Sequence, residues 1–189
     1  NIAWQASSLW RFNAALGTAF RFPALTELYF TGSTPRGDTF GNPNLSPETN
    51  RSVQLGASFA KSQIRCTTSW YYTRLGNYIE RFQVAPGKYS YRNLQAASIW
   101  GMEATLDWAS SARWQHTFNY QWQKGEDRDG NWLADLNPST LRYLSVYRSR
   151  SLIFHNDVTY RFARDNLGEA EQTLASAITW NTRLSRDFG

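Results

Sequence analysis

The chain has 189 residues, enough for one domain or for part of a larger one. Aromatic residues make up 16% of the chain although its mean hydropathy is −0.57, and no apolar run approaches the ~20 residues of a membrane-spanning helix, so a helical membrane protein is excluded. The net charge of +5 comes mainly from scattered arginines, and without a Lys/Arg run a nucleic-acid-binding stripe has little support, so no nucleic-acid partner is expected.

Apolar and polar residues alternate with a period of two along almost the whole chain, which predicts strands. Eight strands are expected, at residues 9–21, 51–60, 64–79, 92–109, 113–124, 140–147, 152–163 and 173–185. The strand at 92–109 shows the pattern best, since its apolar face begins with Trp100 and ends with Trp108. These residues are roughly 27 Å apart along a strand, or roughly 20 Å in height at a tilt of about 40°, close to the ~25 Å apolar band of a membrane barrel.

Other expected strands also place their aromatic residues on one face. The apolar faces are Trp10, Phe12, Leu16 and Phe20; Trp114, Phe118, Tyr120 and Trp122; and Phe154, Val158, Tyr160 and Phe162. A buried core could not accept so many Trp residues at strand ends without partners for the indole N–H, whereas a membrane interface supplies them. The opposite faces are polar, as expected for a water-filled lumen.

The connections between these strands alternate between short and long. The short ones are residues 60–63, 109–112 and 148–151, and the long ones are about 22–50, 80–91, 125–139 and 164–172. Bacterial outer-membrane barrels have this alternation, with tight periplasmic turns and long outer loops. The sequence therefore predicts an all-β fold, an antiparallel up-and-down transmembrane β-barrel.

The connection between the first two expected strands carries two motifs within residues 19–56. They are Phe20-Arg21-Phe22-Pro23 and Asn42-Pro43-Asn44-Leu45-Ser46-Pro47-Glu48. This pair resembles the extracellular-loop signature of TonB-dependent outer-membrane transporters of Gram-negative bacteria. Further resemblances are Trp70-Tyr71-Tyr72 to Asn77-Tyr78-Ile79, then Arg92-Asn93-Leu94 followed by Ile99-Trp100-Gly101-Met102-Glu103, and Asn137-Pro138. Together they cover most of the chain.

The resemblance implies a 22-stranded barrel in the bacterial outer membrane, occluded by an N-terminal plug. Residues 1–189 are then expected to be a fragment of about eight internal-to-late strands, without the plug and the final strands. It also implies active transport without chemistry on the substrate, so no enzyme activity, no catalytic residue and no cofactor is expected. The expected partners are a metal-chelate ligand, TonB through the absent plug segment, and outer-membrane lipid and lipopolysaccharide.

The amino-acid composition of the loops limits which substrates are expected. Haem receptors of this family carry a histidine between the two motifs, but residues 24–41 contain none. Copper transport would favour Met and His, and the chain has one Met and two His. A ferric siderophore is therefore expected, with a cobalamin-like organometal as the remaining choice. The candidate ligand-binding loop residues are aromatics and arginines: Tyr29, Phe30, Arg36, Phe40, Arg81, Phe82, Tyr89, Tyr91 and Arg92. Alternatively, the loop aromatics only pack the loops together.

Three other groups of residues give little support for a metal site or an enzyme active site. The turn at residues 127–131 spaces oxygen ligands as a calcium loop does, but the downstream bidentate Glu is absent and no metal site is expected. His155 stands two residues from Asp157, yet no serine lies in a nucleophile motif. Glu103 and Asp107 would be roughly 13 Å apart along a strand, wider than the ~5–9.5 Å of glycosidase carboxylates, and are expected to pair with lumenal arginines.

Two rival folds remain open. One is a small, complete eight-stranded outer-membrane barrel with a structural or adhesive role, whose closed interior would need bulky side chains. The expected lumenal residues Ala15, Gly56, Ser58 and Thr67 are too small to fill it. The other is a soluble, Trp-rich β-sandwich that binds carbohydrate or nucleic acid.

Overall fold

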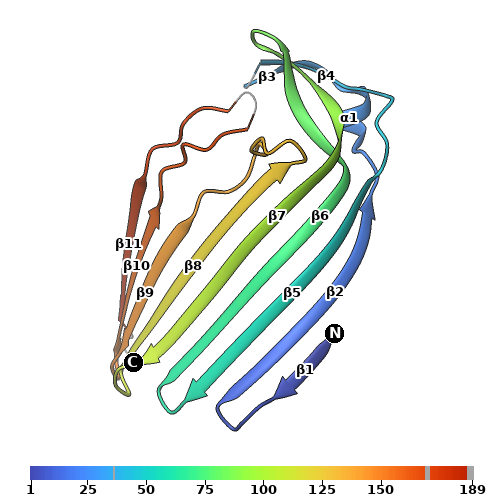
Figure 1. Ribbon diagram of the computed structural model, residues 1–189. Coiled ribbons are helices and arrows are strands. Elements are labelled where there is room, and N and C mark those ends of the chain that lie inside the picture. Colours follow the sequence, from blue (N-terminus) through green and yellow to red (C-terminus); the bar gives the residue numbers. More distant parts are fainter. Residues whose placement is uncertain (36, 169–170, 187–189) are drawn as a thin grey trace.

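In the computed structural model, the strands predicted from the apolar–polar alternation form one curved antiparallel sheet. The structure describes residues 1–35, 37–168 and 171–186. In Figure 1 the strands of its main path follow one another in chain order across the sheet. They are β1 (Ile2–Gln5), β2 (Trp10–Arg21), β5 (Glu48–Lys61), β6 (Ile64–Ala85), β7 (Lys88–Ala109), β8 (Trp114–Asp127), β9 (Thr140–Arg148), β10 (Leu152–Arg161) and β11 (Ala177–Arg186). All eight strands that the alternation predicts are therefore confirmed.

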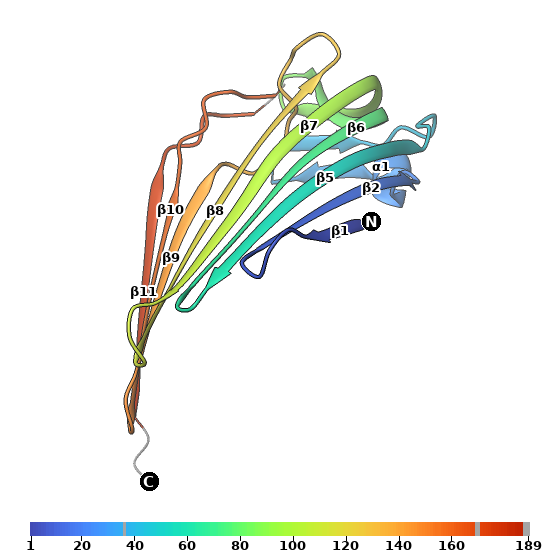
Figure 2. The ribbon, with the colours of Figure 1, turned by 60° about the horizontal axis from the view of Figure 1, so that its bottom comes forward.

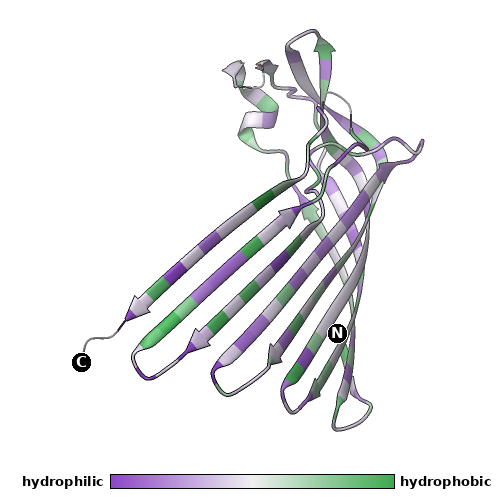
Figure 3. Cartoon of the chain, turned by 90° about the vertical axis from the view of Figure 1, so that its left-hand side faces the viewer, coloured by the Kyte–Doolittle hydropathy of each residue, from purple (hydrophilic) through white to green (hydrophobic). Residues whose placement is uncertain are grey.

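The register separates the sheet into an apolar and a polar face. Leu16, Val53, Tyr72 and Trp100 are successive partners across β2, β5, β6 and β7 on one face. The residues one position away point to the opposite face, and they too are successive partners: Ala15, Gln54, Tyr71 and Gly101. Figure 3 shows the resulting alternation of hydrophilic and hydrophobic residues along each strand.

No second layer covers the apolar face of the described chain. Leu16 is 79% exposed and Leu184 is 66% exposed, although both are large apolar residues of expected strands. A soluble sandwich would bury such a face against a second sheet, so that rival is wrong. Among the described residues, no helix is long and apolar enough to cross a membrane.

The sheet is an open arc rather than a closed eight-stranded barrel (Figure 2). A closed barrel would pair its first strand with its last. Within the described residues, β1 pairs with β2 and β11 pairs with β10, and the two outermost strands do not meet. The small closed barrel is therefore wrong for the described chain.

The expected long connection at 80–91 is instead strand. β6 continues to Ala85 and β7 begins at Lys88, so the two strands form a long hairpin beyond the neighbouring strands (Figure 1). The turn between them is Pro86-Gly87, and Gly87 has φ +72°, which a residue without a Cβ adopts at little cost. Apolar–polar alternation alone did not reveal that these residues pair.

The expected connection at 22–50 contains short elements of its own. They are α1 (Leu25–Tyr29), β3 (Thr31–Thr34) and β4 (Gly37–Phe40). β3 and β4 form a hairpin, and β4 lies parallel to the start of β7 through pairs such as Thr39 with Tyr89. These elements lie at the end of the sheet that holds the tip of the β6–β7 hairpin (Figure 1), which we call the outer end.

The buried apolar cluster also lies at the outer end. Leu75 of β6, Ala97 of β7 and Leu133 of the β8–β9 connection form it, and Leu133 is fully buried. The connection folds back onto the sheet because the Leu133 N–H donates to the Gly125 carbonyl at 3.0 Å. The long connections are thus packed against the sheet and give the outer end a hydrophobic core.

Candidate functional site

The segment that follows β2 is fixed by charge pairs. The Arg21 guanidinium donates to Glu27 at 2.9 Å and lies 3.3 Å from Glu48. Glu27 also accepts the backbone N–H of Ala24 at 2.6 Å, which satisfies one of the free N–H groups at the start of α1. The first sequence motif, which contains Arg21, therefore orients α1 relative to the sheet.

Gly41 allows the β3–β4 hairpin to return against α1. Its N–H donates to the Phe30 carbonyl at 2.6 Å, and the next N–H, of Asn42, donates to the Glu27 carbonyl at 2.8 Å. A Cβ at Gly41 would lie 2.6 Å from the Leu28 carbonyl group and could not fit. Any larger residue at this position would push the hairpin away from α1.

Two asparagines join the second sequence motif to β7. Asn42 donates its side-chain N–H to the Tyr91 carbonyl at 2.9 Å. Asn93 donates to the Ser46 carbonyl at 3.0 Å and to the Asn77 carbonyl at 2.7 Å, and it accepts the Ser46 N–H at 2.8 Å. The motifs that carried the family resemblance therefore hold the outer end together.

A pocket of about 380 Å³ opens between α1, the β3–β4 hairpin and the β6–β7 hairpin. Its lining combines aromatic, hydroxyl and cationic side chains: Thr26, Phe30, Thr34, Pro35, Thr39, Arg81 and Tyr91. The Thr39 hydroxyl is buried and has no hydrogen-bond partner among the described residues. Three of the sequence-predicted residues, Phe30, Arg81 and Tyr91, come together here.

The two predicted arginines of the β6–β7 hairpin have different partners. The Arg81 guanidinium lies 4.6 Å from the centre of the Tyr89 ring, and no carboxylate of the described chain forms an ion pair with it. Arg92 pairs with Glu80 at 3.0 Å and also lies over the Phe82 ring at 4.6 Å. Arg81 therefore brings positive charge to the pocket, whereas the charge of Arg92 is compensated by Glu80.

The remaining predicted residues lie outside this pocket. Tyr29 ends α1 with 67% of its surface exposed, and Phe40 ends β4. Arg36 lies outside the described residues. Thr39 was missed because a threonine in a short loop strand gives no sequence signal, and its burial follows from the pairing of β4 with β7.

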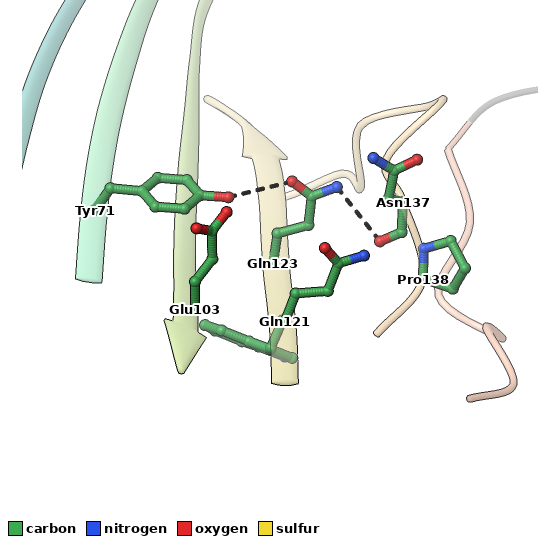
Figure 4. Close-up of a pocket in the computed structure, with 7 residues that line it drawn as sticks. Tyr71, Glu103, Gln121, Gln123, Asn137 and Pro138 are labelled. Carbon is green, nitrogen blue, oxygen red and sulfur yellow. Dashed lines mark hydrogen bonds between the residues drawn. The ribbon is translucent and has the colours of Figure 1, made fainter. Parts of the chain in front are cut away.

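A second polar site lines the lumenal face of the sheet (Figure 4). Tyr71 of β6 donates to the Gln123 side-chain oxygen of β8 at 3.4 Å, and Gln123 donates to the Asn137 carbonyl at 3.4 Å. Glu103 and Gln121 face the same pocket, which has a volume of about 90 Å³. Sequence reasoning placed Glu103 on this face, but only the register shows that it is level with Ser69 and Gln121.

The expected arginine partners of the lumenal carboxylates are wrong. Asp107 accepts a hydrogen bond from the Thr117 hydroxyl at 2.7 Å, and Glu103 forms no ion pair with a described residue. Asp157 accepts hydrogen bonds from Nε and Nη2 of Arg142, at 2.9 and 2.5 Å. Because these bonds engage both carboxylate oxygens, Asp157 is not positioned to orient His155 for catalysis.

The turn at residues 127–131 uses its carboxylate to close the turn. The two Asp127 oxygens accept the N–H groups of Asp129 and Asn131 and the Asn131 side chain, at 2.8–2.9 Å. Partial burial alone would raise the pKa of Asp127, but these bonds together lower it. No cluster of three or more His, Cys, Asp or Glu residues that could hold a metal ion occurs in the described part of the chain.

Comparisons with known proteins assign the fold. Residues 1–188 match the family described as TonB dependent receptor-like, beta-barrel. A hemin receptor of Yersinia pestis is 27% identical over 65% of this chain and 21% of its own length. The vitamin B12 transporter BtuB of Vibrio vulnificus is 26% identical over 94% of this chain and 30% of its own length. The chain thus spans about a fifth to a third of these curated relatives.

Solved structures share the arrangement of strands. The copper transporter OprC superposes with a TM-score of 0.84 at 17% identity, over 98% of this chain and 30% of OprC. The siderophore receptor PirA of Acinetobacter baumannii superposes with a TM-score of 0.74 at 17% identity, over 99% of this chain and 34% of PirA. At this identity the likeness establishes the fold alone, which confirms the expected barrel architecture.

Proposed function

Since the chain belongs to the TonB-dependent receptor β-barrel family, we propose that it forms part of the wall and outer loops of a transporter for an anionic metal chelate, a ferric siderophore. The family consists of outer-membrane receptors and transporters of Gram-negative bacteria, not enzymes, and the chain is part of such a protein. We further infer that residues 1–189 supply internal-to-late strands of a 22-stranded barrel. The complete transporter would bind TonB through its plug.

The observation that carries the proposal is the setting of Arg81. Its guanidinium faces the outer pocket beside Phe30 and Tyr91, and no described carboxylate pairs with it. A planar cation next to aromatic rings suits a ligand that has both negative charge and flat aromatic surface. Ferric siderophore complexes commonly have these properties. The buried Thr39 hydroxyl adds a hydrogen-bonding group without a described partner.

Haem is the second candidate, because a relative of this chain is a hemin receptor. Haem binding would need an axial ligand such as histidine. Neither the pocket lining nor the whole of residues 24–41 contains one. The two histidines of the chain, His116 and His155, lie on β8 and β10, away from this pocket. The siderophore therefore fits the residues better than haem.

Ligand binding by the complete transporter tests the proposal. Quenching of intrinsic fluorescence would be titrated with ferric enterobactin, hemin and cyanocobalamin. We expect the ferric siderophore to bind most tightly, and Arg81→Ala to weaken it by about tenfold or more, because a charge-assisted contact is lost. Arg128→Ala is the matched control, since this outer-loop arginine donates to Gln95 and does not line the pocket.

Two results would contradict the proposal. Tighter binding of hemin or cyanocobalamin than of the ferric siderophore would overturn the substrate class. Equal weakening by Arg81→Ala and Arg128→Ala would show that general surface charge, and not this pocket, attracts the ligand. An Arg81→Lys variant separates planar recognition from charge alone, because lysine keeps the charge without the planar fork.

A further inference from the structure

A polar row crosses the apolar, lipid-facing side of the sheet. His116, Ser145, Asn156 and Thr182 are successive register partners across β8, β9, β10 and β11. The rows on either side are apolar or aromatic: Trp114, Tyr147, Phe154 and Leu184 toward the short turns, and Phe118, Tyr143, Val158 and Trp180 toward the outer end. Four polar side chains thus interrupt this apolar face in one line, and the depth at which they lie decides what can pair with them.

The row lies at the level of the aromatic belt near the short turns. His116 is the register partner of Trp108, which ends the apolar face of β7. It is also two residues from Trp114, the first residue of β8, or roughly 7 Å along the strand. Short turns of outer-membrane barrels face the periplasm, and aromatic belts lie at the depth of the lipid headgroups. The row therefore meets the interfacial region of the periplasmic leaflet.

The row lines a shallow notch of about 440 Å³. The polar side chains His116, Ser145 and Asn156 face it, between the rings of Trp114 and Phe154. Ser145 is only 3% exposed, and it lines the notch. A molecule bound in the notch could therefore exchange a hydrogen bond with its hydroxyl.

Asn156 leaves further donors at the notch. Its side-chain oxygen accepts the indole N–H of Trp180 at 2.6 Å. This bond fixes the orientation of the amide, because the oxygen must point toward the indole. The NH2 group then has no acceptor among the described residues, and two N–H donors remain beside the Ser145 hydroxyl.

His116 uses the proton of only one of its two hydroxyl partners. Its Nε2 lies 2.9 Å from the Ser110 hydroxyl and its Nδ1 lies 2.8 Å from the Tyr143 hydroxyl. In a neutral imidazole one nitrogen donates and the other accepts, so only one of the two hydroxyl protons is used. The other O–H remains available whichever tautomer is present. The notch therefore offers the Asn156 NH2 group and one hydroxyl proton as donors to a bound molecule.

The two short turns next to the notch carry positive charge. Arg113 and Arg150 lie within residues 109–113 and 148–151, which contain no Asp or Glu, whereas Arg148 donates to Gln115 at 2.7 Å on the lumenal face. Arginine forms bidentate contacts with phosphate oxygens. Basic residues at a membrane surface each add about 1 kcal/mol of attraction to anionic lipid. Both the donors and the charge point to an anionic acceptor at headgroup depth.

We propose that this notch binds the phosphate–glycerol headgroup of one membrane glycerophospholipid in the periplasmic leaflet. The phosphate oxygens accept from Asn156, from Ser145 and from whichever hydroxyl, of Ser110 or Tyr143, does not donate to His116. Arg113 and Arg150 neutralise the phosphate charge from the adjacent turns. The acyl chains then extend along the apolar row that includes Phe118 and Val158. The site lies on the opposite face of the sheet from the lumen.

Native mass spectrometry of the complete protein in detergent tests the site. Phosphatidylglycerol and diacylglycerol with the same acyl chains would be titrated separately, since they differ in the phosphate headgroup. We expect phosphatidylglycerol to bind, diacylglycerol to bind at least about tenfold more weakly, and His116→Leu and Ser145→Ala each to weaken phosphatidylglycerol by about threefold to tenfold. Thr68→Val is the control, because it removes a hydroxyl from the same face of β6, away from the notch.

Several outcomes would overturn the proposal. Equal binding of the two lipids would remove the phosphate from the explanation, and equal loss in Thr68→Val would mean that the whole lipid face binds lipid without a specific site. Preferential retention of lipopolysaccharide, or a dimer that forms through β8–β10, would assign the notch to another occupant. Ser145→Ala removes only one oxygen atom and is expected to leave the fold intact. It therefore still tests the site if the His116→Leu variant does not fold. These results do not depend on the substrate carried through the barrel.

Discussion

The wall of the sheet and its outer end are stabilised in different ways. Among the described residues, the buried apolar side chains of the outer end are Leu45, Leu75, Ile79, Ala97, Leu133 and Ala134, whereas the wall contributes only Val146. The wall is held by strand pairing along its whole length and presents its large apolar residues outward. The outer end resembles a small soluble core built on top of a membrane sheet. The two parts are therefore expected to respond to different perturbations.

The largest effect is expected from Leu133→Ala. Leu133 is fully buried against Leu75 and Ala97, so its truncation leaves a cavity that costs about 2–5 kcal/mol. We expect hydrogen–deuterium exchange to accelerate at the outer ends of β6 and β7 while the wall stays protected. Val53→Ala, on the exposed apolar face of β5, is the control and should leave the outer end unchanged. Equal acceleration throughout the wall would contradict the separation of the two parts.

A smaller effect is expected from alkaline pH, through Tyr78. Burial first, and then the negative charges of Glu48, Glu80 and Asp135, raise the pKa of this phenol to about 12. Tyr78 lies beyond Tyr72, the partner of the outer belt residue Trp100, and so outside the membrane-spanning part of β6. Because the folded pKa exceeds the ordinary value near 10, the neutral phenol stabilises the fold fully below pH ~10.

That stabilisation is lost as the pH rises from about 10 to 12, by on the order of 2 kcal/mol at full ionisation. Tyrosinate absorbance and exchange at the outer end, measured between pH 9 and 12 in the complete protein, would check this. Tyr78→Phe should remove the pH-dependent part, since it keeps the ring and lacks the ionisable group. A titration near pH 10 without loosening of the outer end would contradict the burial of this phenol.

The smallest effect is expected from the Arg142–Asp157 pair on the lumenal wall. The pair is bidentate, but the Arg142 side chain is 50% exposed and the lumen is wet, so Arg142→Met should cost no more than about 1 kcal/mol. Urea unfolding of the complete protein in detergent measures this, with Arg183→Met as the control on the same face of β11. A cost as large as that of Leu133→Ala would mean that this part of the lumen is dry.

The wall could be predicted closely from the chain. Strands such as β2, expected at 9–21 and found at Trp10–Arg21, follow from the period of two, which is a local property of the sequence. The outer end was less predictable. α1 has five residues and β3 has four, too few for a periodic pattern to stand out, and β6 and β7 extend through a region expected to be loop.

The candidate site was predicted in part. Phe30, Arg81 and Tyr91 were expected from residue type and loop position, and they share one pocket. Arg92 was expected for the same reasons, but Glu80 compensates its charge. Residue type does not distinguish these two arginines, because their difference lies in which carboxylate the fold places nearby.

By itself, then, the sequence determined the strands, the polar and apolar faces, and the family, because side-chain alternation and short motifs are written in neighbouring residues. Only the tertiary structure decided which residues stand level with one another. His116, Ser145 and Asn156 are far apart in the chain and carry no common motif. They form a row because hydrogen bonding between strands sets the register, and register aligns side chains across a sheet.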